Sequence, residues 1–421
     1  MQPIVCLFAS LALAAKLAVG QPLSCAAGLD GKLPSIIPSD FHFSGKVRTY
    51  YIQAEQDTWD YAASGWDNWL GVPFNDSPRA ASAGYTATGS FGTKWQKALY
   101  RGYTDASFTQ RTQQPSWQGI NGPTLRAEVG DMIQILFINN LTSNYVSMHS
   151  MGLAYSKEFE GSIYPNTTTG GAPTPAPGDA VAPGDCVVYK WLINDGSAPY
   201  PGTDSTLWSY HSFVNMAADL NTGLQGPTIV YNSGMMNSTM ASHREFILLY
   251  ENFDETQSFL ASTNQIMYGN ATNASSNAIP VTLEHNYSGN TSFWKPQLTN
   301  MPTVTLSSTQ APQWYTLNGA VFSNLPPFEM CTDDRAIWYV YSFGAASHVF
   351  HMHGNGFNYH GNNMASKSIN DGNMMTLQMN ATATGIWQVL CHVNDHLSAG
   401  MEGNYQVYPK AGCPLPALSS N

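Results

Sequence analysis

Two short stretches near the C-terminus contain side chains that could bind a redox metal. Residues 348–353 read His-Val-Phe-His-Met-His, and residues 391–401 begin Cys-His-Val-Asn-Asp-His and end in Met. A lone Cys or His is usually structural. A thiolate, imidazoles and a thioether at matched spacing instead favour copper at a site of two His and one Cys with a weak axial Met. We therefore predict a mononuclear blue-copper centre formed by His348, Cys391, His396 and Met401.

The alternation of side chains along a strand would let these stretches serve two sites. If 389–393 is a strand, Cys391 and His392 point to opposite faces. The same parity places His348 on the Cys391 side and puts the two later His of its stretch on one face together. The peptide bond between Cys391 and His392 would then connect the two sites, and we predict it as a route for electrons.

The sequence around these ligands resembles that of a known family. The His-x-x-His-x-His pattern and residues 385–402, Gly-Ile-Trp-Gln-Val-Leu-Cys-His-Val-Asn-Asp-His-Leu-Ser-Ala-Gly-Met-Glu, are similar to multicopper oxidases, most of all to the ceruloplasmin and hephaestin branch. The similarity continues through 155–161 and 315–322 and covers nearly the whole mature chain. It implies an all-β fold of two cupredoxin-like Greek-key β-sandwich domains, at 21–235 and 236–421, the second of which carries the type 1 copper.

The resemblance also implies further copper ligands. Family members that reduce dioxygen hold three more coppers with four His-x-His pairs. By position, the type 2 copper would be bound by His149 and His351, and the remnant of the type 3 pair by His211, His353 and His392. The other three positions are occupied here by Met151, Phe213 and Leu390. Two of these are hydrocarbon and the thioether suits Cu(I), so we expect an incomplete trinuclear cluster and weak dioxygen reduction.

Local patterns agree with an all-β chain. Residues 41–54 are rich in aromatic and β-branched side chains, and 122–140 predict two alternating strands around a Gly-Asp turn. Another strand is expected at 186–193. We interpret 57–111 as loops between short strands and 262–300 as a polar, glycosylated loop.

Composition excludes some classes of function. The 421 residues carry a formal charge of −11, with 17 Lys and Arg against 28 acids, so a nucleic-acid partner is not expected. The length predicts two domains. Beyond the N-terminal apolar run, no segment is apolar enough to span a membrane.

Several features predict a secreted, extracellular glycoprotein. Residues 4–19 form an apolar run that ends in small residues, as in a signal peptide cleaved after residue 20. Acceptor sequences for N-glycosylation occur at Asn75, Asn140, Asn166, Asn237, Asn270, Asn273, Asn286, Asn290 and Asn380. If Cys391 binds metal, the mature chain keeps an even number of other cysteines, Cys25, Cys186, Cys331 and Cys413, whose pairing into disulfides stays open.

These observations favour a copper oxidoreductase that takes single electrons from a small-molecule reductant and passes them to an oxygen-reactive copper site. Phenolic or other aromatic reductants are favoured over Fe(II), because 359–368 contains no Asp or Glu and Asp371 is the nearest acid. The alternatives are a blue-copper electron carrier without dioxygen chemistry and a structural interaction module. Two-domain relatives form cyclic trimers, so a homotrimer is a further expectation.

Overall fold

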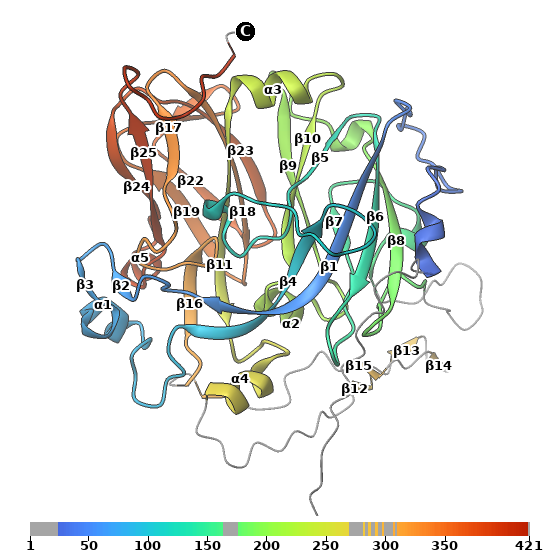
Figure 1. The fold of residues 1–421 in the computed structure, drawn as a ribbon, viewed down its shortest axis with the longest axis horizontal. Coiled ribbons are helices and arrows are strands. Elements are labelled where there is room, and N and C mark those ends of the chain that lie inside the picture. Colours follow the sequence, from blue (N-terminus) through green and yellow to red (C-terminus); the bar gives the residue numbers. More distant parts are fainter. Residues whose placement is uncertain are drawn as a thin grey trace, which may run out of the picture.

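The computed structural model describes residues 24–162, 176–268, 306–307 and 310–419, and the backbone of short strands within 281–298. The predicted signal peptide at 1–20 and most of the predicted glycosylated loop at 262–300 lie outside the described residues. The described chain consists mainly of β-strands, with short helices at their ends (Figure 1).

Two four-stranded sheets form the first part of the chain. The outer one has the order β4 (Lys94–Tyr103), β1 (Val47–Asp60), β6 (Met132–Asn139) and β8 (Cys186–Leu192). The inner one has the order β5 (Leu125–Glu128), β10 (Gln225–Tyr231), β9 (Ser205–His211) and β7 (His149–Met151).

Two larger sheets form the second part. The inner one has the order β16 (Gln313–Leu317), β11 (Arg244–Asp254), β18 (Arg335–Phe343), β23 (Met374–Asn380), β20 (Phe357–Tyr359) and β21 (Asn362–Met364). The outer one has the order β17 (Phe328–Cys331), β25 (Glu402–Tyr408), β24 (Gly385–Cys391), β19 (Ser347–Met352) and β22 (Ser366–Asn370).

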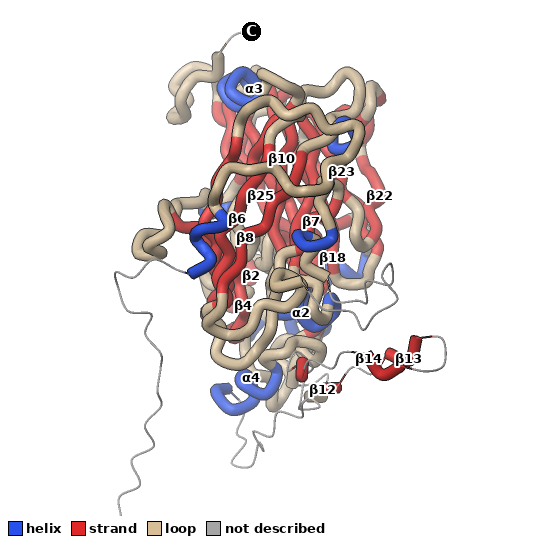
Figure 2. Tube along the Cα trace, turned by 90° about the vertical axis from the view of Figure 1, so that its right-hand side faces the viewer, coloured by secondary structure: helices blue, strands red, loops and turns tan. Residues whose placement is uncertain are grey.

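Short elements complete the described structure. Small two-stranded sheets pair β2 (Trp66–Asp67) with β3 (Val72–Pro73), β12 (Val281–Thr282) with β15 (Gln297–Leu298), and β13 (His285–Tyr287) with β14 (Thr291–Phe293). The helices are α1 (Pro78–Ser82), α2 (Met216–Thr222), α3 (Met236–Ser242), α4 (Ala261–Tyr268) and α5 (Asn394–Ser398). The 3-10 turns include Ser24–Gly28, Phe74–Asp76, Ser116–Gln118, Lys157–Phe159 and Asp195–Ser197. Helix α3 lies at one end of the strands, and α2 and α4 lie at the other (Figure 2).

The four large sheets stack as two β-sandwiches that lie side by side (Figure 1). One apolar core fills the first sandwich and another fills the second, and a third lies between the two inner sheets and joins the sandwiches. Strand β11 serves two of these cores by alternation: Phe246, Leu248 and Tyr250 pack inside the second sandwich, whereas Ile247 and Leu249 face the first. The predicted all-β fold of two cupredoxin-like sandwiches is confirmed, and the residue limits of the two domains stay a prediction.

One local prediction was confirmed and another was wrong. The two strands predicted around the Gly130 turn are present as β5 and β6, and they lie in different sheets, because β5 pairs with β10 in the inner sheet while β6 pairs with β1 and β8 in the outer one. Gly130 has a φ of +92°, and a Cβ there would lie 2.7 Å from the His42 carbonyl oxygen. Within 57–111, expected to be loops and short strands, β4 is ten residues long. Most of β4 is buried on both faces, which hides the alternation that marks a half-buried strand.

Buried charges lie at the contact between the sandwiches. Lys97 of β4 is fully buried, and its Nζ lies 2.7 Å from Glu255 Oε1 and 2.7 Å from the Asn221 carbonyl oxygen. The hydroxyl of Tyr61 donates to the same Glu255 oxygen at 2.5 Å. Burial raises the pKa of Glu255 and lowers that of Lys97, and their mutual attraction opposes both shifts. Removing either Lys97 or Glu255 would therefore leave the other as a buried group without its opposite charge.

The open question of disulfide pairing is settled by the structure. Cys25 is bonded to Cys186 and Cys331 to Cys413, which ties each sandwich to a terminal segment. Cys391 is the free, buried cysteine of the described residues.

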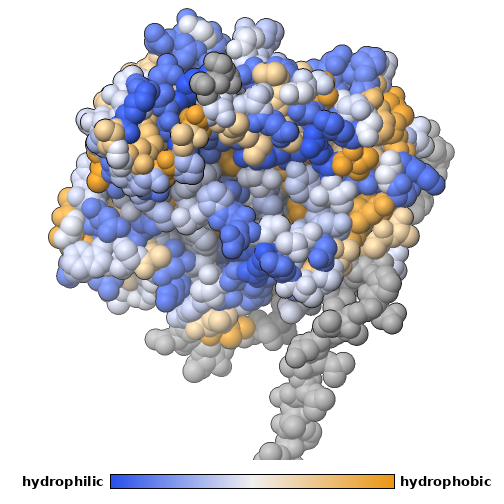
Figure 3. All heavy atoms as spheres, turned by 45° about the horizontal axis from the view of Figure 1, so that its top comes forward, coloured by the Kyte–Doolittle hydropathy of each residue, from blue (hydrophilic) through white to orange (hydrophobic). Residues whose placement is uncertain are grey.

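Among the described residues, no helix has the length and apolar character needed to cross a membrane. The face seen in Figure 3 is mainly hydrophilic, with apolar residues scattered between polar ones.

Candidate metal centre

Two neighbouring strands and the turn that follows them position the predicted mononuclear centre. Strand β19 carries His348 and strand β24 ends at Cys391, which lies opposite Phe350 in the antiparallel register. Helix α5 begins shortly after β24 and carries His396. His348 and Cys391 are fully buried, and His396 is 9% exposed. The three side chains thus converge beneath the surface from two strands and one helical turn.

The three donor atoms form a compact triangle. His348 Nδ1 and His396 Nδ1 are 3.1 Å apart, and Cys391 Sγ lies 3.8 Å from the first and 3.5 Å from the second. A point equidistant from the three atoms lies about 2 Å from each, close to the usual length of a metal–imidazole bond. Two imidazoles and a thiol at these distances match the donor set of a trigonal copper site.

Protonation also suits metal binding. Burial lowers the pKa of His348 to about 3, and the neighbouring His396 acts in the same direction. Burial also lowers the pKa of His396 and raises that of the Cys391 thiol. Both imidazoles are therefore neutral at physiological pH, which is the form that binds a metal. The thiol would lose its proton when a cation binds.

Met401, the predicted axial ligand, is fully buried in the same apolar core as Cys391. Its N–H donates to the His396 carbonyl at 3.0 Å, and its own carbonyl accepts from the Cys391 N–H at 3.0 Å. The Val349 N–H lies 3.5 Å from Cys391 Sγ. The backbone thus connects the predicted ligands directly and offers the sulfur a hydrogen bond.

Three further predicted ligands lie on the opposite face of the same strands. The His351 ring lies 5.1 Å from the His353 ring and 5.2 Å from the His392 ring, between centroids. Cys391 is buried and His392 is exposed, in keeping with the alternation expected for β24. Leu390 lies opposite His351 in the register and is buried, so this position offers only hydrocarbon.

The first sandwich brings together the remaining predicted ligands. His149 of β7 lies opposite His211 of β9, with ring centroids 5.5 Å apart. The Phe213 ring lies 5.0 Å from the His149 ring and 5.5 Å from the His211 ring. The Ser209 hydroxyl donates to the Met151 sulfur at 3.5 Å. Burial lowers the pKa of His149, and it lowers that of His211 to about 4.

Three of these imidazoles share one hydrogen-bonding arrangement. Their Nδ1 atoms lie 2.7 to 2.9 Å from backbone carbonyl oxygens, in the pairs His149–Glu160, His211–Ser212 and His351–Ala365. A carbonyl only accepts, so Nδ1 carries the proton and Nε2 keeps a free lone pair. Such an outer hydrogen bond commonly fixes the ring of a metal-binding His.

The predicted type 2 and type 3 ligands fall into two sets, which belong to different sandwiches. Strand β7 lies in the first sandwich, whereas β19 and β24 lie in the second (Figure 1). In the described part of the chain, the group of three or more His, Cys, Asp or Glu ligands with donor atoms within 4.8 Å of one another is His348, Cys391 and His396. Among the described residues, the geometry therefore brings together His348, Cys391 and His396, and it does not gather the predicted trinuclear ligands into such a group.

Two residues beside His396 escaped the sequence analysis. The Tyr315 ring of β16 lies 4.8 Å from the His396 ring and is half-buried. Asp395 is exposed and directly precedes His396. Asp395 could have been found, since it lies inside the ligand stretch. Tyr315 is 81 residues from His396 in the sequence, and no local pattern indicates their contact.

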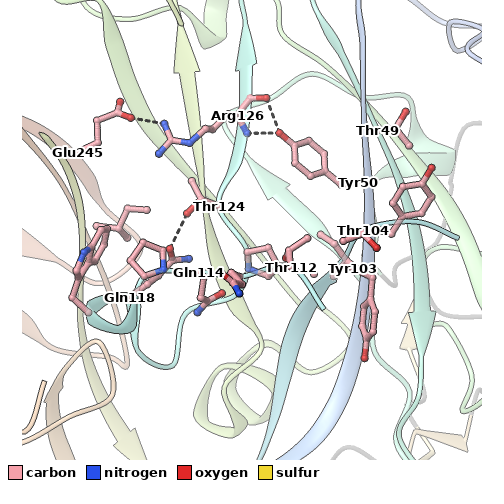
Figure 4. Close-up of a pocket in the computed structure, with 18 residues that line it drawn as sticks. Thr49, Tyr50, Tyr103, Thr104, Thr112, Gln114, Gln118, Thr124, Arg126 and Glu245 are labelled. Atoms are coloured by element: carbon pink, nitrogen blue, oxygen red, sulfur yellow. Dashed lines mark hydrogen bonds and ion pairs between the residues drawn. The ribbon is translucent and has the colours of Figure 1, made fainter. Parts of the chain in front are cut away.

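A separate cavity of about 580 Å³ lies where the sandwiches meet (Figure 4). Tyr50 bonds to the Arg126 backbone, the Arg126 guanidinium bonds to Glu245, and Thr124 bonds to Gln118. None of the predicted metal ligands lines this cavity. The cavity is therefore separate from the predicted ligand cluster.

Comparison with known proteins agrees with this donor set. Residues 293–411 match the family model of the multicopper oxidases. Solved structures with a similar fold include a multicopper oxidase, with a TM-score of 0.51 and 15% identity over 86% of this chain and 90% of that one. Another is the blue copper oxidase of Nitrosomonas europaea, with a TM-score of 0.51 and 15% identity over 89% of each chain. The family model thus matches the segment that contains the ligand cluster, and the solved structures show the same fold.

The curated relatives narrow the resemblance. Mouse ferroxidase HEPHL1 is 30% identical over 86% of this chain, human hephaestin is 29% identical over 86%, and human ceruloplasmin is 28% identical over 86%. These matches cover 29%, 29% and 32% of the relatives' own lengths. The predicted resemblance to the hephaestin and ceruloplasmin branch is confirmed, and copper is the metal that it implies. The triangle of neutral imidazoles and a thiol fits that metal.

Proposed function

We propose that this protein is a copper-dependent oxidase that takes single electrons from a small-molecule reductant and delivers them to dioxygen. The observation that carries this proposal is the triangle of His348 Nδ1, Cys391 Sγ and His396 Nδ1, with sides of 3.1 to 3.8 Å. The relatives named ferroxidase, hephaestin and ceruloplasmin support oxidase chemistry over an electron carrier.

In this proposal His348, Cys391, His396 and Met401 would hold a type 1 copper. When bound, the copper supplies a centre that gains and loses one electron by cycling between Cu(II) and Cu(I). The surrounding residues exclude water, because His348, Cys391 and Met401 are all fully buried. A site that is dry and held by the backbone changes little between the two oxidation states, which favours fast electron transfer.

Cys391 and His392 would carry the electrons onward. The two residues are adjacent, and their side chains face opposite sides of β24, so a short covalent path crosses the strand. The His392 ring lies beside that of His351, which also neighbours the His353 ring, and His351 and His353 are proposed copper ligands of the second site. Four one-electron oxidations of the reductant would supply the four electrons that reduce dioxygen, with four protons, to two waters.

The second site would need the other sandwich as well. His149 and His211 keep Nε2 free for a metal, as does His351. Because the two sets lie in different sandwiches, we propose that a neighbouring copy supplies the missing half, in a homotrimer of closed symmetry. Met151, Phe213 and Leu390 would leave this cluster with fewer ligands than in complete oxidases.

For the reductant, we propose a phenolic or other aromatic compound. Tyr315 beside His396 offers an aromatic contact near the proposed point of electron entry. Asp371, the acid nearest to the loop expected to bind iron, is exposed, and its carboxylate already accepts backbone hydrogen bonds. Fe(II) is the second candidate, because relatives are named ferroxidase and exposed Asp395 lies next to His396.

We further propose that the protein is secreted. Its two disulfides are typical of an oxidising compartment. The acceptor asparagines within the described residues, Asn75, Asn140, Asn237 and Asn380, are all exposed and open to glycosylation. The predicted limits of a signal peptide at 1–20 and domains at 21–235 and 236–421 belong to this proposal.

Oxygen consumption by the copper-loaded full chain tests the proposed activity. A phenolic donor and Fe(II) are compared in the wild type and in Cys391→Ser, which removes the thiolate and keeps the size of the side chain. We expect consumption with the phenol, a lower kcat/KM with Fe(II), and none above background in the variant. Equal consumption by the variant would refute the proposed entry site. Reduction of the copper by the donor without oxygen uptake would instead support an electron carrier.

A further inference from the structure

A segment of the first half of the chain covers the ligand loop of the second. Residues 61–93, which connect β1 to β4, include β2, β3 and α1 and lie beside α5 (Figure 1). The Tyr85 hydroxyl donates to the Ala399 carbonyl at 3.0 Å. Tyr85 also stacks on Trp314, with centroids 4.1 Å apart. We call residues 61–93 the cap. Part of the cap thus contacts residues 396–402, the loop that begins at His396 and includes Met401.

One side chain of the cap binds both ends of this loop. Arg79 of α1 donates from Nη2 to the Leu397 carbonyl at 2.6 Å and from Nη1 to Glu402 Oε1 at 2.8 Å. Leu397 directly follows His396, and Glu402 directly follows Met401. The planar guanidinium therefore spans the two positions that adjoin the proposed ligands, with the fixed fork geometry that a lysine lacks.

The guanidinium is itself held on all sides. It lies 4.9 Å from the Phe322 ring centroid and 5.4 Å from that of Trp69. Asp67 Oδ1 lies 3.7 Å from Nη1, and Asp67 is fixed by the Ser77 hydroxyl at 2.7 Å. The Arg79 side chain is 18% exposed, and the Asp67 and Glu402 side chains are 0% exposed. A charge in this setting has a defined position and little freedom to move.

The backbone of the loop depends on such external contacts. Gly400 has a φ of +93°, its N–H donates to the Leu397 carbonyl at 3.0 Å, and its carbonyl accepts from the Phe322 N–H at 2.8 Å. A Cβ at Gly400 would lie 2.6 Å from the Phe322 ring. The loop is thus clamped between Phe322 and the cap.

We propose that Arg79 is a positioning residue for the copper centre: it sets the separation of His396 and Met401 by bridging the residues that follow them. This inference rests on the proposed function, since it assumes that the triangle binds copper. It assigns the cap a role in the redox centre of the other sandwich. Arg79 does not touch the proposed metal, and it acts through the loop.

The test compares two arginine variants of the full chain. Arg79→Met removes the guanidinium fork and keeps an unbranched apolar stem. The control is Arg48→Met, because Arg48 is also partly buried, at 24% exposure, and also pairs with two acids, Glu128 and Asp131, but lies on β1 away from the loop. Each protein is loaded with copper, and its visible and EPR spectra and its copper loss to a chelator are measured. Arg79→Lys, which keeps the charge, is the conservative variant.

We expect Arg79→Met to lose copper about 10- to 100-fold more readily and to shift the visible band and the EPR splitting. Arg48→Met should keep the wild-type spectra. Arg79→Lys should lose copper less readily than Arg79→Met and show smaller spectral shifts. Wild-type spectra and retention in Arg79→Met would overturn the proposal. If that variant does not fold, Arg79→Lys decides the matter, because wild-type behaviour there would show that the fork is not needed.

A measurement without metal separates this inference from the proposed function. In the metal-free chain, hydrogen exchange at the Met401 amide, which bonds to the His396 carbonyl, should be faster in Arg79→Met than in Arg48→Met. Equal exchange in the two variants would also overturn the proposal. A wild-type chain that binds no copper would refute the proposed function, whatever the exchange result.

Discussion

Replacing Lys97 by Met should destabilise the contact between the two sandwiches in a pH-dependent way. Lys97 is fully buried and bonds to Glu255 Oε1 at 2.7 Å, while the other Glu255 oxygen has no hydrogen-bond partner in the described structure. In the variant, Glu255 would keep only the Tyr61 hydroxyl as a donor. A lone buried carboxylate takes up a proton instead of remaining charged.

The cost follows from that protonation. The ordinary pKa of the group is 4.5, and each pH unit above it adds about 1.4 kcal/mol to the free energy of holding the carboxyl neutral. The ceiling is thus about 3.4 kcal/mol at pH 7 and about 0.7 kcal/mol at pH 5. Because the pKa of Glu255 in the folded variant is raised above its unfolded value, this cost is absent below the unfolded pKa and grows as the pH rises above it. The variant should recover at low pH.

Urea unfolding of the wild type and Lys97→Met at pH 7 and pH 5 measures both values. The matched control is the double variant with Glu255→Gln, which removes the charge that Lys97 balances and should unfold with nearly the same free energy at both pH values. A loss that is equal at pH 5 and pH 7 would refute the reasoning, because it would indicate lost packing and not an unpaired acid.

Three further predictions concern the disulfides and the copper sites. Replacing Cys331 and Cys413 by Ser opens a loop spanning 82 residues and should lower the free energy of unfolding by about 2 to 4 kcal/mol, measured in urea without reductant; an unchanged midpoint would contradict this. Leu390→His adds an imidazole opposite His351 and should raise the copper content and the rate of oxygen uptake, as metal analysis and an oxygen electrode would test; no change in either would speak against a second site there. The wild type should consume oxygen slowly with a phenolic donor and release some peroxide, and brisk reduction to water alone would mean that the cluster is complete despite its missing His.

Much of the centre could be predicted because its ligands lie in two short stretches. The parity of β24 follows from local geometry, so the opposite orientations of Cys391 and His392 could be inferred without knowing the fold. The resemblance to multicopper oxidases supplied the two-sandwich architecture. Disulfide pairing needed the structure, because cysteine spacing does not encode it: Cys25 and Cys186 are 161 residues apart.

Several features that escaped prediction depend on contacts that are distant in the sequence. Arg79 and Glu402 are 323 residues apart, and nothing in the local sequence of α1 indicates a partner in the other sandwich. The turn between β5 and β6 could be predicted, but the strand that each of them pairs with could not, because β10, β1 and β8 are distant in the sequence. The length of β4 was hidden because both of its faces are buried, so its sequence does not alternate.

The most direct test of the central claim is the combined visible and EPR spectrum of the copper-loaded wild type beside that of Cys391→Ser. The account predicts an intense visible band and a narrow copper splitting in the wild type, both absent from the variant, because the thiolate of Cys391 in the triangle with His348 and His396 gives the centre its colour. A wild-type protein that binds copper stoichiometrically and shows no intense visible band would contradict the assignment.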